Sequence, residues 1–335
     1  MENYSLLIRV VSALFVSFFL GVLLSPIVIS AARKLKAGQP ILTYVEQHAD
    51  KRGTPTFGGF IFLIPAVLVT IAILWSDGLS IGMIAMLVMV SFSVIGFLDD
   101  YIKIKTKDNM GLRPYQKILG QIAVAIIVAL YAYKSEAIGS RVYIPFYAVP
   151  IDLGIWYVPF AAFVYLALSN CVNLTDGVDG LASNCSAVYL LTFEVIFLYS
   201  AFEAEGESTL PIFTASLLGG VIAFLLFNTN KAKIFMGDTG SLALGGASAA
   251  IALFSGQPFL ILLVGIMYVL SGISIILQVA YFKVTHGKRI FLMAPYHHHL
   301  EKKGWSEARI CTLYATVTFL MGLIAILSVV SRHAV

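Results

Sequence analysis

The sequence predicts an all-α, polytopic integral membrane protein with about ten transmembrane helices. Apolar residues make up 59% of the 335 residues and charged residues only 12%, against roughly 45–50% and 25% in soluble domains. The apolar runs are long and continuous rather than alternating. A run of roughly 20 apolar residues satisfies its backbone groups inside a bilayer by forming a helix.

The apolar runs define the expected spans. With boundaries good to a few residues, they cover about 6–31, 58–75, 79–98, 117–134, 155–170, 183–201, 210–228, 239–256, 259–282 and 310–330. The first run is expected to remain as a helix, because its basic cluster, Arg33, Lys34 and Lys36, follows the apolar stretch instead of preceding it. Residues 135–154 are expected to form a short hairpin. No internal repeat or linker is evident, so residues 1–335 are expected to form a single transmembrane domain.

Lysine and arginine are distributed unequally between the two ends of the spans. Of the 22 such residues, 18 fall in the loops 32–57, 99–117, 229–238 and 283–309. Basic loops remain in the cytoplasm, so these four loops are expected to be cytoplasmic. An even number of spans then places both termini outside.

Net charge and cysteine content narrow the function classes. The formal net charge of +4 is mild and follows from the basic loops, so it does not indicate a nucleic-acid partner. A basic inner face can attract anionic membrane lipid or a phosphorylated donor. The cysteines, Cys171, Cys185 and Cys311, lack the spacing of a zinc site or disulfide framework and are expected to be reduced and structural.

Five aspartates lie in polar segments on the basic side. Carboxylates near hydrocarbon persist where they line water, bind a cation or handle protons, so the sequence predicts one metal-dependent site. Asp99 and Asp100 end the third span in FLDDYIKIKTKD. Adjacent carboxylates repel, which suits either a proton acceptor or a magnesium site. The alternative is a solvated helix end with lysines nearby.

A second polar segment, SNCVNLTDGVDGLA, contains four polar side chains at three-residue intervals: Asn170, Asn173, Asp176 and Asp179. In a helix this spacing keeps neighbouring groups near one face, whereas Gly177 and Gly180 allow tight turns and a close approach of the backbone to a ligand. Either geometry gathers oxygen ligands and amide donors. An ordinary connecting loop is the alternative, and the density of polar residues favours a functional segment.

A third segment, FNTNKAKIFMGDTGSLALGG, places Asn228 and two lysines before Asp238. Asp238, Thr239 and Ser241 can cap the following helix. Free amides at a helix start also bind phosphate, and both interpretations can hold together.

The last basic loop contains MAPYHHHLEKKGWSE, with His297, His298 and His299. Three consecutive imidazoles cannot share one helix face, which argues against a zinc site, but they can donate to phosphate oxygens or transfer protons. The earlier segment KRGTPTFGG offers Lys51 and Thr56 for anion binding.

These motifs resemble those of the polyprenyl-phosphate phosphoglycosyl transferases. The resemblance rests on DDYIK, NCVNLTDGVDGLA, MGDTGSLALGG and APYHHHLE, and it spans essentially the whole chain. KRGTPTFGG and the triple histidine are more similar to the phospho-N-acetylmuramoyl-pentapeptide transferase subgroup than to the N-acetylglucosamine-phosphate transferases.

The resemblance implies transfer of phospho-N-acetylmuramoyl-pentapeptide from UDP-N-acetylmuramoyl-pentapeptide to undecaprenyl phosphate, giving lipid I and UMP in bacterial peptidoglycan synthesis. It also implies dependence on Mg²⁺, a homodimer, and an active site on the cytoplasmic face of the bacterial inner membrane. A ninth helix that breaks and leans into the membrane is implied as well, and Gly265 or Gly272 can permit the bend.

The resemblance further implies roles for individual residues. The expected metal ligands are Asp238 and Asp176, and the expected catalytic residues are Asp99, Asp100, Asp238 and His297. Asp99 would take a proton from the lipid phosphate or help to position it, and Phe235 would stack on uracil. The expected substrate contacts are Lys51, Thr56, Lys103, Lys117, Asn170, Asn173, Asp176, Asp179, Asn228, Phe235, His298 and His299.

Two alternatives stay open at this level. Direct attack by the lipid phosphate and a two-step route through an aspartyl-phosphate fit the same residues. A transporter is the rival class, but transporters place ionisable groups near the midplane, whereas the aspartates here lie at the ends of spans. Glu194 lies inside the sixth span and is expected to be hydrogen-bonded or protonated rather than to form a transport site.

Overall fold

The protein is described by a computed structural model covering residues 2–35, 53–106, 111–203 and 208–333. Its elements in order are α1 (Glu2–Lys34), α2 (Phe60–Leu74), η2 (Trp75–Asp77), α3 (Ile81–Thr106), α4 (Pro114–Lys134), β1 (Arg141–Val142), β2 (Ile151–Asp152), η3 (Gly154–Trp156), α5 (Tyr157–Thr175), α6 (Leu181–Glu203), α7 (Leu210–Asn228), α8 (Gly237–Phe254), η4 (Pro258–Leu260), α9 (Ile261–Val264), α10 (Ile266–Val284), α11 (Tyr296–Lys302) and α12 (Glu307–His333).

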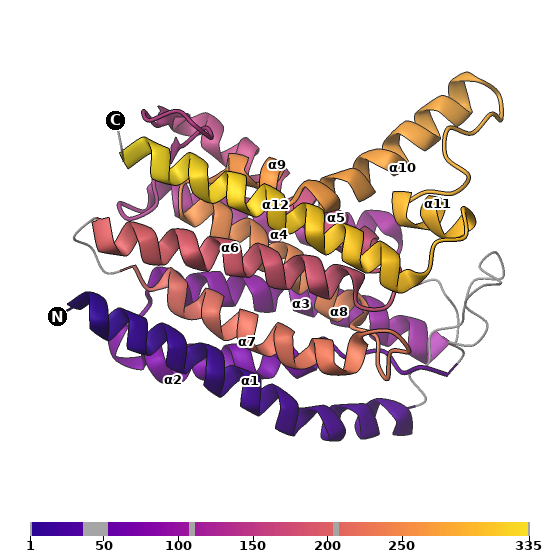
Figure 1. The fold of residues 1–335 in the computed structure, drawn as a ribbon, viewed down its shortest axis with the longest axis horizontal. Coiled ribbons are helices and arrows are strands. Elements are labelled where there is room, and N and C mark those ends of the chain that lie inside the picture. The colour runs from indigo at the N-terminus through magenta and orange to yellow at the C-terminus, as the bar shows by residue number, and fades with distance from the viewer. Residues whose placement is uncertain (1, 36–52, 107–110, 204–207, 334–335) are drawn as a thin grey trace.

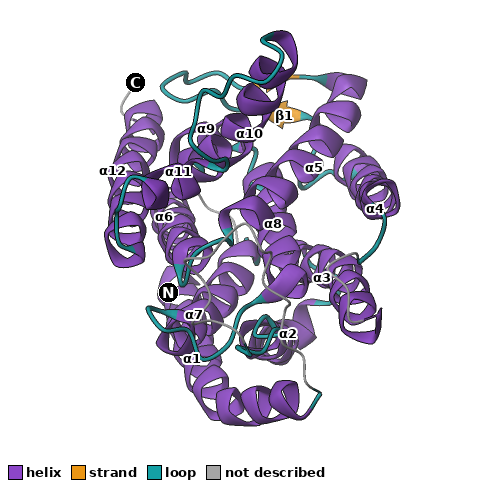
Figure 2. Cartoon of the chain, turned by 90° about the vertical axis from the view of Figure 1, so that its right-hand side faces the viewer, coloured by secondary structure: helices purple, strands orange, loops and turns teal. Residues whose placement is uncertain are grey.

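Long helices run beside one another, as the sequence predicts (Figure 1). In the described part of the chain, nine helices are long and apolar enough to cross a membrane. The expected span at 239–256 corresponds to α8, which is not among the nine although it is 18 residues long. Gly, Ala and Ser are abundant in α8, and Figure 2 shows it in the middle of the other helices. The all-α membrane fold is confirmed, with α8 as a central helix shielded by protein.

Small residues let α3 and α5 approach α8 closely. A Cβ on Gly96 of α3 would lie 2.1 Å from the carbonyl oxygen of Asp238. A Cβ on Gly245 of α8 would lie 2.4 Å from the Cα of Ser169 in α5. Close backbone approach at small residues is how membrane helices gain packing energy. These contacts hold the start and the middle of α8 against its two neighbours.

The two ends of the helix bundle differ. Both chain ends lie at one end of the bundle in Figure 1, whereas α11 and the far end of α10 lie at the other. This agrees with an even number of crossings. The side of the membrane on which the termini lie stays a prediction.

The expected ninth span is broken, as predicted. Gly265 separates the short α9 from α10, and α10 leans away from the other helices in Figure 1. Gly272 lies inside α10 and does not break it. Only the first of the two candidate glycines therefore makes the bend. The expected hairpin is confirmed too: β1 and β2 pair antiparallel, with Val142 opposite Ile151.

Glu194 lies on α6, within a candidate membrane span, and is 4% exposed. Neither of its carboxyl oxygens has a hydrogen-bond partner in the described part of the chain. The hydrogen-bonded form expected from the sequence is therefore not seen there. An unpaired carboxylate is costly in such surroundings, which leaves the protonated form.

Candidate functional site

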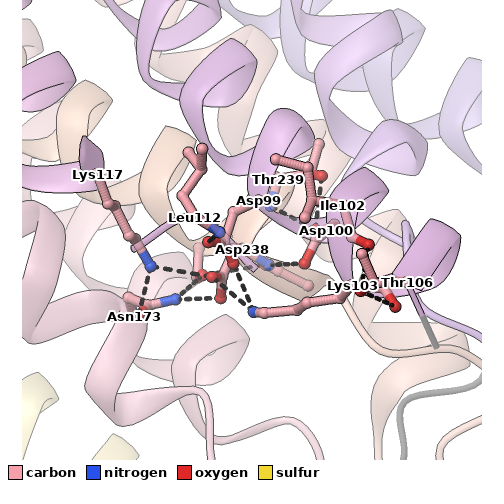
Figure 3. A network of polar contacts seen from close by, with 12 residues as sticks. Asp99, Asp100, Ile102, Lys103, Thr106, Leu112, Lys117, Asn173, Asp238 and Thr239 are labelled. Carbon is pink, nitrogen blue, oxygen red and sulfur yellow. Dashed lines mark hydrogen bonds and ion pairs between the residues drawn. The ribbon is translucent and has the colours of Figure 1, made fainter. Parts of the chain in front are cut away.

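The N-terminus of α8 is held by Asp100, near the end of α3 (Figure 3). The Asp100 carboxylate accepts hydrogen bonds from the backbone amides of Asp238 (3.2 Å) and Thr239 (2.8 Å), and from the Thr239 hydroxyl (2.7 Å). The first amides of a helix have no partner within it, and a negative charge there is favourable. Asp100 thus fixes where α8 starts and where the Asp238 side chain points.

Asp238 is the point on which three other helices converge. Its Oδ2 accepts hydrogen bonds from Lys103 (3.0 Å) on α3 and Lys117 (2.9 Å) on α4, and its Oδ1 accepts one from the Asn173 amide (2.7 Å) on α5. Lys117 also lies 3.5 Å from Asn173 Oδ1. The packing of these helices around α8 therefore gathers side chains that are far apart in the sequence (Figure 3).

Asp99 joins the same cluster from the end of α3. Its Oδ2 lies 2.6 Å from the Lys103 ammonium, and its Oδ1 accepts a hydrogen bond from the Leu112 backbone amide at 2.8 Å. The Asp99 and Asp238 carboxyl groups lie close to each other. Neighbouring carboxylates repel unless a proton or a cation is held between them.

Asp99, Asp100 and Asp238 each bring one oxygen to within 4.8 Å of the others. Carboxylate oxygens are the ligands that Mg²⁺ prefers. Two lysine ammonium groups face these three carboxyl groups, so one charge is left for a shared proton or a cation to balance. The residues fit a divalent cation in ligand type and in charge.

The triple-histidine motif lies on α11, against the loop that follows α5. His297 is fully buried, and its ring centroid lies 4.4 Å from that of His298 and 6.4 Å from that of Tyr314. A Cβ on Gly177 would come within 2.4 Å of His297 Nε2. Gly177 is therefore needed for the loop to pass this close to the imidazole.

The other two histidines point to different neighbours. His298 Nδ1 lies 2.5 Å from Glu301 Oε2, while its Nε2 faces Gly177. His299 Nδ1 instead accepts a hydrogen bond from the Leu292 backbone amide at 3.0 Å. Burial lowers the pKa of the His299 imidazole. The structure thus places His297 and His298 beside the loop after α5, and His299 against the loop before α11.

Three of the predicted substrate contacts brace other parts of the fold. Asn170 donates a hydrogen bond to Gln121 (2.8 Å), one helical turn before Asn173. Asp179 accepts one from the Ala232 backbone amide (2.9 Å), and the Asn228 amide donates one to the Ile234 carbonyl (3.0 Å). Asp179 and Asn228 thereby fix residues 229–236, the segment that leads into α8.

The segment around Thr56 lies beside the start of α8. The Phe235 backbone amide donates to the Pro55 carbonyl at 2.9 Å, and a Cβ on Gly237 would lie 2.5 Å from Thr56 Oγ1. Thr56 is buried, and its hydroxyl has no hydrogen-bond partner in the described chain. Phe235 is half-buried. The predicted contact Lys51 lies outside the described residues.

Asp176 follows the last residue of α5. Its backbone amide donates to the Asn173 carbonyl, and its side chain is not one of the three carboxyl groups gathered within 4.8 Å. Burial raises the pKa of Asp176 to about 8, and the Asp238 and Asp100 carboxylates add to the shift. Asp176 therefore lies within electrostatic reach of the cluster, and its raised pKa favours the protonated form when no cation is bound.

The sequence analysis missed the polar contacts between α4 and α5. Gln121 faces Asn170 as Lys117 faces Asn173, and Ser241 accepts a hydrogen bond from Asn173 at 2.8 Å. Lys117 and Gln121 are four residues apart, which is the spacing of one helix face. The spacing of Lys117 and Gln121, matched by that of Asn170 and Asn173, is the sequence feature from which these contacts could have been predicted.

Fold and site together fit an integral-membrane enzyme whose carboxylates and lysines gather where its helices end. Comparison with known proteins narrows the class. The sequence model of glycosyl transferase family 4 matches residues 81–256. The chain is 44% identical over 320 residues to the phospho-N-acetylmuramoyl-pentapeptide-transferase of Clostridium botulinum (strain Eklund 17B / Type B), covering 95% of this chain and 96% of that protein.

Other relatives carry the same name. The phospho-N-acetylmuramoyl-pentapeptide-transferase of Clostridium perfringens (strain 13 / Type A) is 44% identical over 321 residues, covering 96% of this chain and 98% of that protein. The corresponding protein of Clostridium novyi (strain NT) is 39% identical over 319 residues, covering 95% of this chain and 96% of that protein. The chain belongs to glycosyl transferase family 4 and, within it, to the phospho-N-acetylmuramoyl-pentapeptide-transferases, so the resemblance seen in the sequence is confirmed.

Proposed function

We propose that this enzyme transfers phospho-N-acetylmuramoyl-pentapeptide from its UDP carrier to undecaprenyl phosphate, giving lipid I and UMP. An oxygen of the lipid phosphate attacks the phosphorus bound to the sugar, and the bond from that phosphorus to the oxygen of UMP breaks. The observation that carries the proposal is the Asp238 carboxylate, held by Lys103, Lys117 and Asn173 at the start of α8.

Charge neutralisation is the main task in this reaction. Both reactants are anions, so phosphoryl transfer depends more on alignment and positive charge than on covalent help. Lys103 and Lys117 lie 3.0 and 2.9 Å from Asp238 Oδ2 and can turn on flexible stems to meet phosphate oxygens. They hold the phosphates while Asn173 keeps Asp238 in place.

Mg²⁺ is the proposed cofactor, and Asp238 and Asp99 would hold it. When bound, it would supply positive charge to neutralise phosphate oxygens and the leaving UMP. Asp176, within electrostatic reach of the cluster, is a further candidate ligand. Asp100 uses both of its oxygens on the amides and hydroxyl at the start of α8. Its proposed role is therefore to position Asp238.

Asp99 is the proposed acceptor for the proton of the lipid phosphate. It lies beside Asp238 and contacts Lys103, so a proton taken up there stays within the cluster. A direct route and a route through an aspartyl-phosphate differ in one observable. Only the second releases one equivalent of UMP before undecaprenyl phosphate is added.

The donor is proposed to extend from the acid cluster towards α11. Asn173 donates a hydrogen bond to Asp238, and Asp176 directly precedes Gly177, which meets His297 and His298. These histidines are proposed to contact the phosphate or sugar. Further donor contacts are proposed for Thr56 and Phe235 beside the start of α8, and for Lys51, which lies outside the described residues. Asn170, Asp179, Asn228 and His299 are proposed to support the donor site through the segments that they brace.

The cellular setting is proposed from charge and family. With 18 of the 22 Lys and Arg residues in the four basic loops, the acid cluster faces the cytoplasm at a bacterial inner membrane. Residues 1–335 are proposed to act as one domain, and the enzyme as a homodimer. The position of the aspartates at helix ends, not at midplane, disfavours a transporter.

The test is UMP release by the purified protein in detergent, with undecaprenyl phosphate and either UDP-N-acetylmuramoyl-pentapeptide or UDP-N-acetylglucosamine. Release with the first donor alone, dependent on the lipid, is expected. Preference for the second donor would keep the superfamily and overturn the assigned substrate. Absence of release from demonstrably folded protein would reopen the transporter hypothesis.

A further inference from the structure

A basic cavity, lined by other residues than the aspartate cluster, lies between the end of α1 and the segment that leads into α8. Its volume is about 510 Å³, and its lining includes Pro26, Ile29, Arg33, Lys34, Phe227 and Lys233. Three of these side chains are cationic and three are apolar, and the described lining, which also includes Ser30, contains no acidic residue. The size is that of a small-molecule site, roughly 300–1,000 Å³. Its charge is opposite to that of the aspartate cluster.

The cations of this cavity have no carboxylate partner in the part of the chain that the structure describes. Among the described residues, none of Arg33, Lys34 and Lys233 forms an ion pair. The Lys233 ammonium instead lies 5.8 Å from the centre of the Phe227 ring, and the Lys233 backbone amide donates to the Phe227 carbonyl at 2.8 Å. Three cations without an ion pair among the described residues, set beside apolar side chains, favour an anion that carries an apolar tail.

The helices beside the cavity present apolar side chains outward. Leu23 and Ile27 on α1 are 68% and 64% exposed, and Leu226 on α7 is 57% exposed. α1 and α7 pack against each other, and in a membrane these side chains meet hydrocarbon. An acyl chain lying along them would bring its headgroup to the level of Arg33 and Lys34, which end α1.

We propose that this cavity binds the headgroup of an anionic phospholipid, with the phosphodiester facing Arg33, Lys34 and Lys233 and an acyl chain along α1 and α7. Basic pockets between membrane helices on the cytoplasmic side suit such headgroups. Lys233 belongs to the segment 229–236 that leads to Asp238. A bound lipid therefore also steadies the approach to the acid cluster.

The site is tested by native mass spectrometry of the full-length protein in detergent, with phosphatidylglycerol or phosphatidylethanolamine added and no UDP donor. Each Lys or Arg near an anionic lipid contributes roughly a fivefold change in affinity. Lys233→Gln is therefore expected to lower phosphatidylglycerol retention about fivefold, and the triple variant Arg33→Gln, Lys34→Gln, Lys233→Gln further. Lys233→Arg is expected to retain the lipid.

Lys288→Gln is the matched control, because Lys288 is an exposed lysine in the loop between α10 and α11, at the same end of the bundle. Size-exclusion chromatography checks that each variant is folded. If the triple variant does not fold, the proposal is judged from phosphatidylglycerol retention by Lys233→Gln. Unchanged retention in a folded Lys233→Gln variant would overturn the proposal, as would equal retention of both phospholipids by the wild type. An equal loss of undecaprenyl phosphate retention would also overturn it, because the cavity would then serve the substrate lipid.

Discussion

Replacement of Asp100 by asparagine is predicted to destabilise the fold as well as slow the reaction. Asp100 accepts three hydrogen bonds from the start of α8, and an amide oxygen can replace only one of the two carboxylate oxygens. A hydrogen bond to a charged acceptor contributes about 1.5–3 kcal/mol and a neutral one about 0.5–1.5 kcal/mol. If the amide oxygen takes the place of Oδ2, the two bonds from Thr239 each lose about 1 kcal/mol.

The third bond, from the Asp238 backbone amide, is lost because the new NH₂ group faces another donor. That loss adds about 2 kcal/mol, so Asp100→Asn is expected to lower the free energy of unfolding by about 2–4 kcal/mol once neighbours relax. The assay is chemical unfolding in detergent with divalent metal chelated, run beside UMP release. Thr239→Val removes a single donor and is expected to cost about 1 kcal/mol.

The opposite outcome would refute this reasoning. If Asp100→Asn unfolds with the wild-type free energy but loses turnover, Asp100 takes part in the chemistry rather than holding α8. Chelation of divalent metal in the unfolding assay keeps metal binding out of the comparison.

Three further predictions concern the rest of the chain. Gly177→Ala is expected to lower turnover at least tenfold, because the added Cβ would displace His297. Gly120→Ala is the control: its Cβ would meet only ordinary contacts at 3.5–3.9 Å, so UMP release is expected to match that of the wild type. Glu194→Gln is expected to change turnover by less than about twofold and the free energy of unfolding by less than about 1 kcal/mol, because Gln resembles the protonated acid in shape; complete loss of catalysis in a folded variant would contradict this. In metal-free protein, the pKa of Asp176 is about 8 in the folded state and about 4 in the unfolded chain. The folded state therefore binds this proton more tightly, and the free energy of unfolding is expected to fall as pH rises from about 4 to about 8. The Asp176→Asn variant is expected to lose that slope, and an unchanged slope would place the titrating group elsewhere.

Hydropathy was sufficient to predict most of the fold. Long apolar runs specify membrane helices because the bilayer leaves the backbone few alternatives. Within residues 135–154, Pro145 and Pro150 indicated the short hairpin. The exception is α8, whose Gly, Ala and Ser residues suit close contact with other helices rather than lipid. Hydropathy alone records how apolar a segment is and not whether protein or lipid surrounds it.

The sequence predicted that several aspartates share one site, and the structure gathers Asp99, Asp100 and Asp238. The contacts of each residue could not be predicted, because the role of Asp100 depends on where α3 ends relative to α8. The same limit applies to Asn228 and Asp179, which lie in conspicuous motifs and brace residues 229–236. Sequence spacing fixes neighbours along one helix, whereas contacts between helices depend on packing that small residues such as Gly96 permit.

The most direct test of the central claim is a Mg²⁺ titration of UMP release by the wild type and by Asp238→Asn. The wild type is expected to show saturable, Mg²⁺-dependent release. The folded, membrane-inserted Asp238→Asn variant is expected to show none at any Mg²⁺ concentration, because its lysines and Asn173 would surround a neutral group. Wild-type release by this variant would remove Asp238 from the reaction and contradict the account.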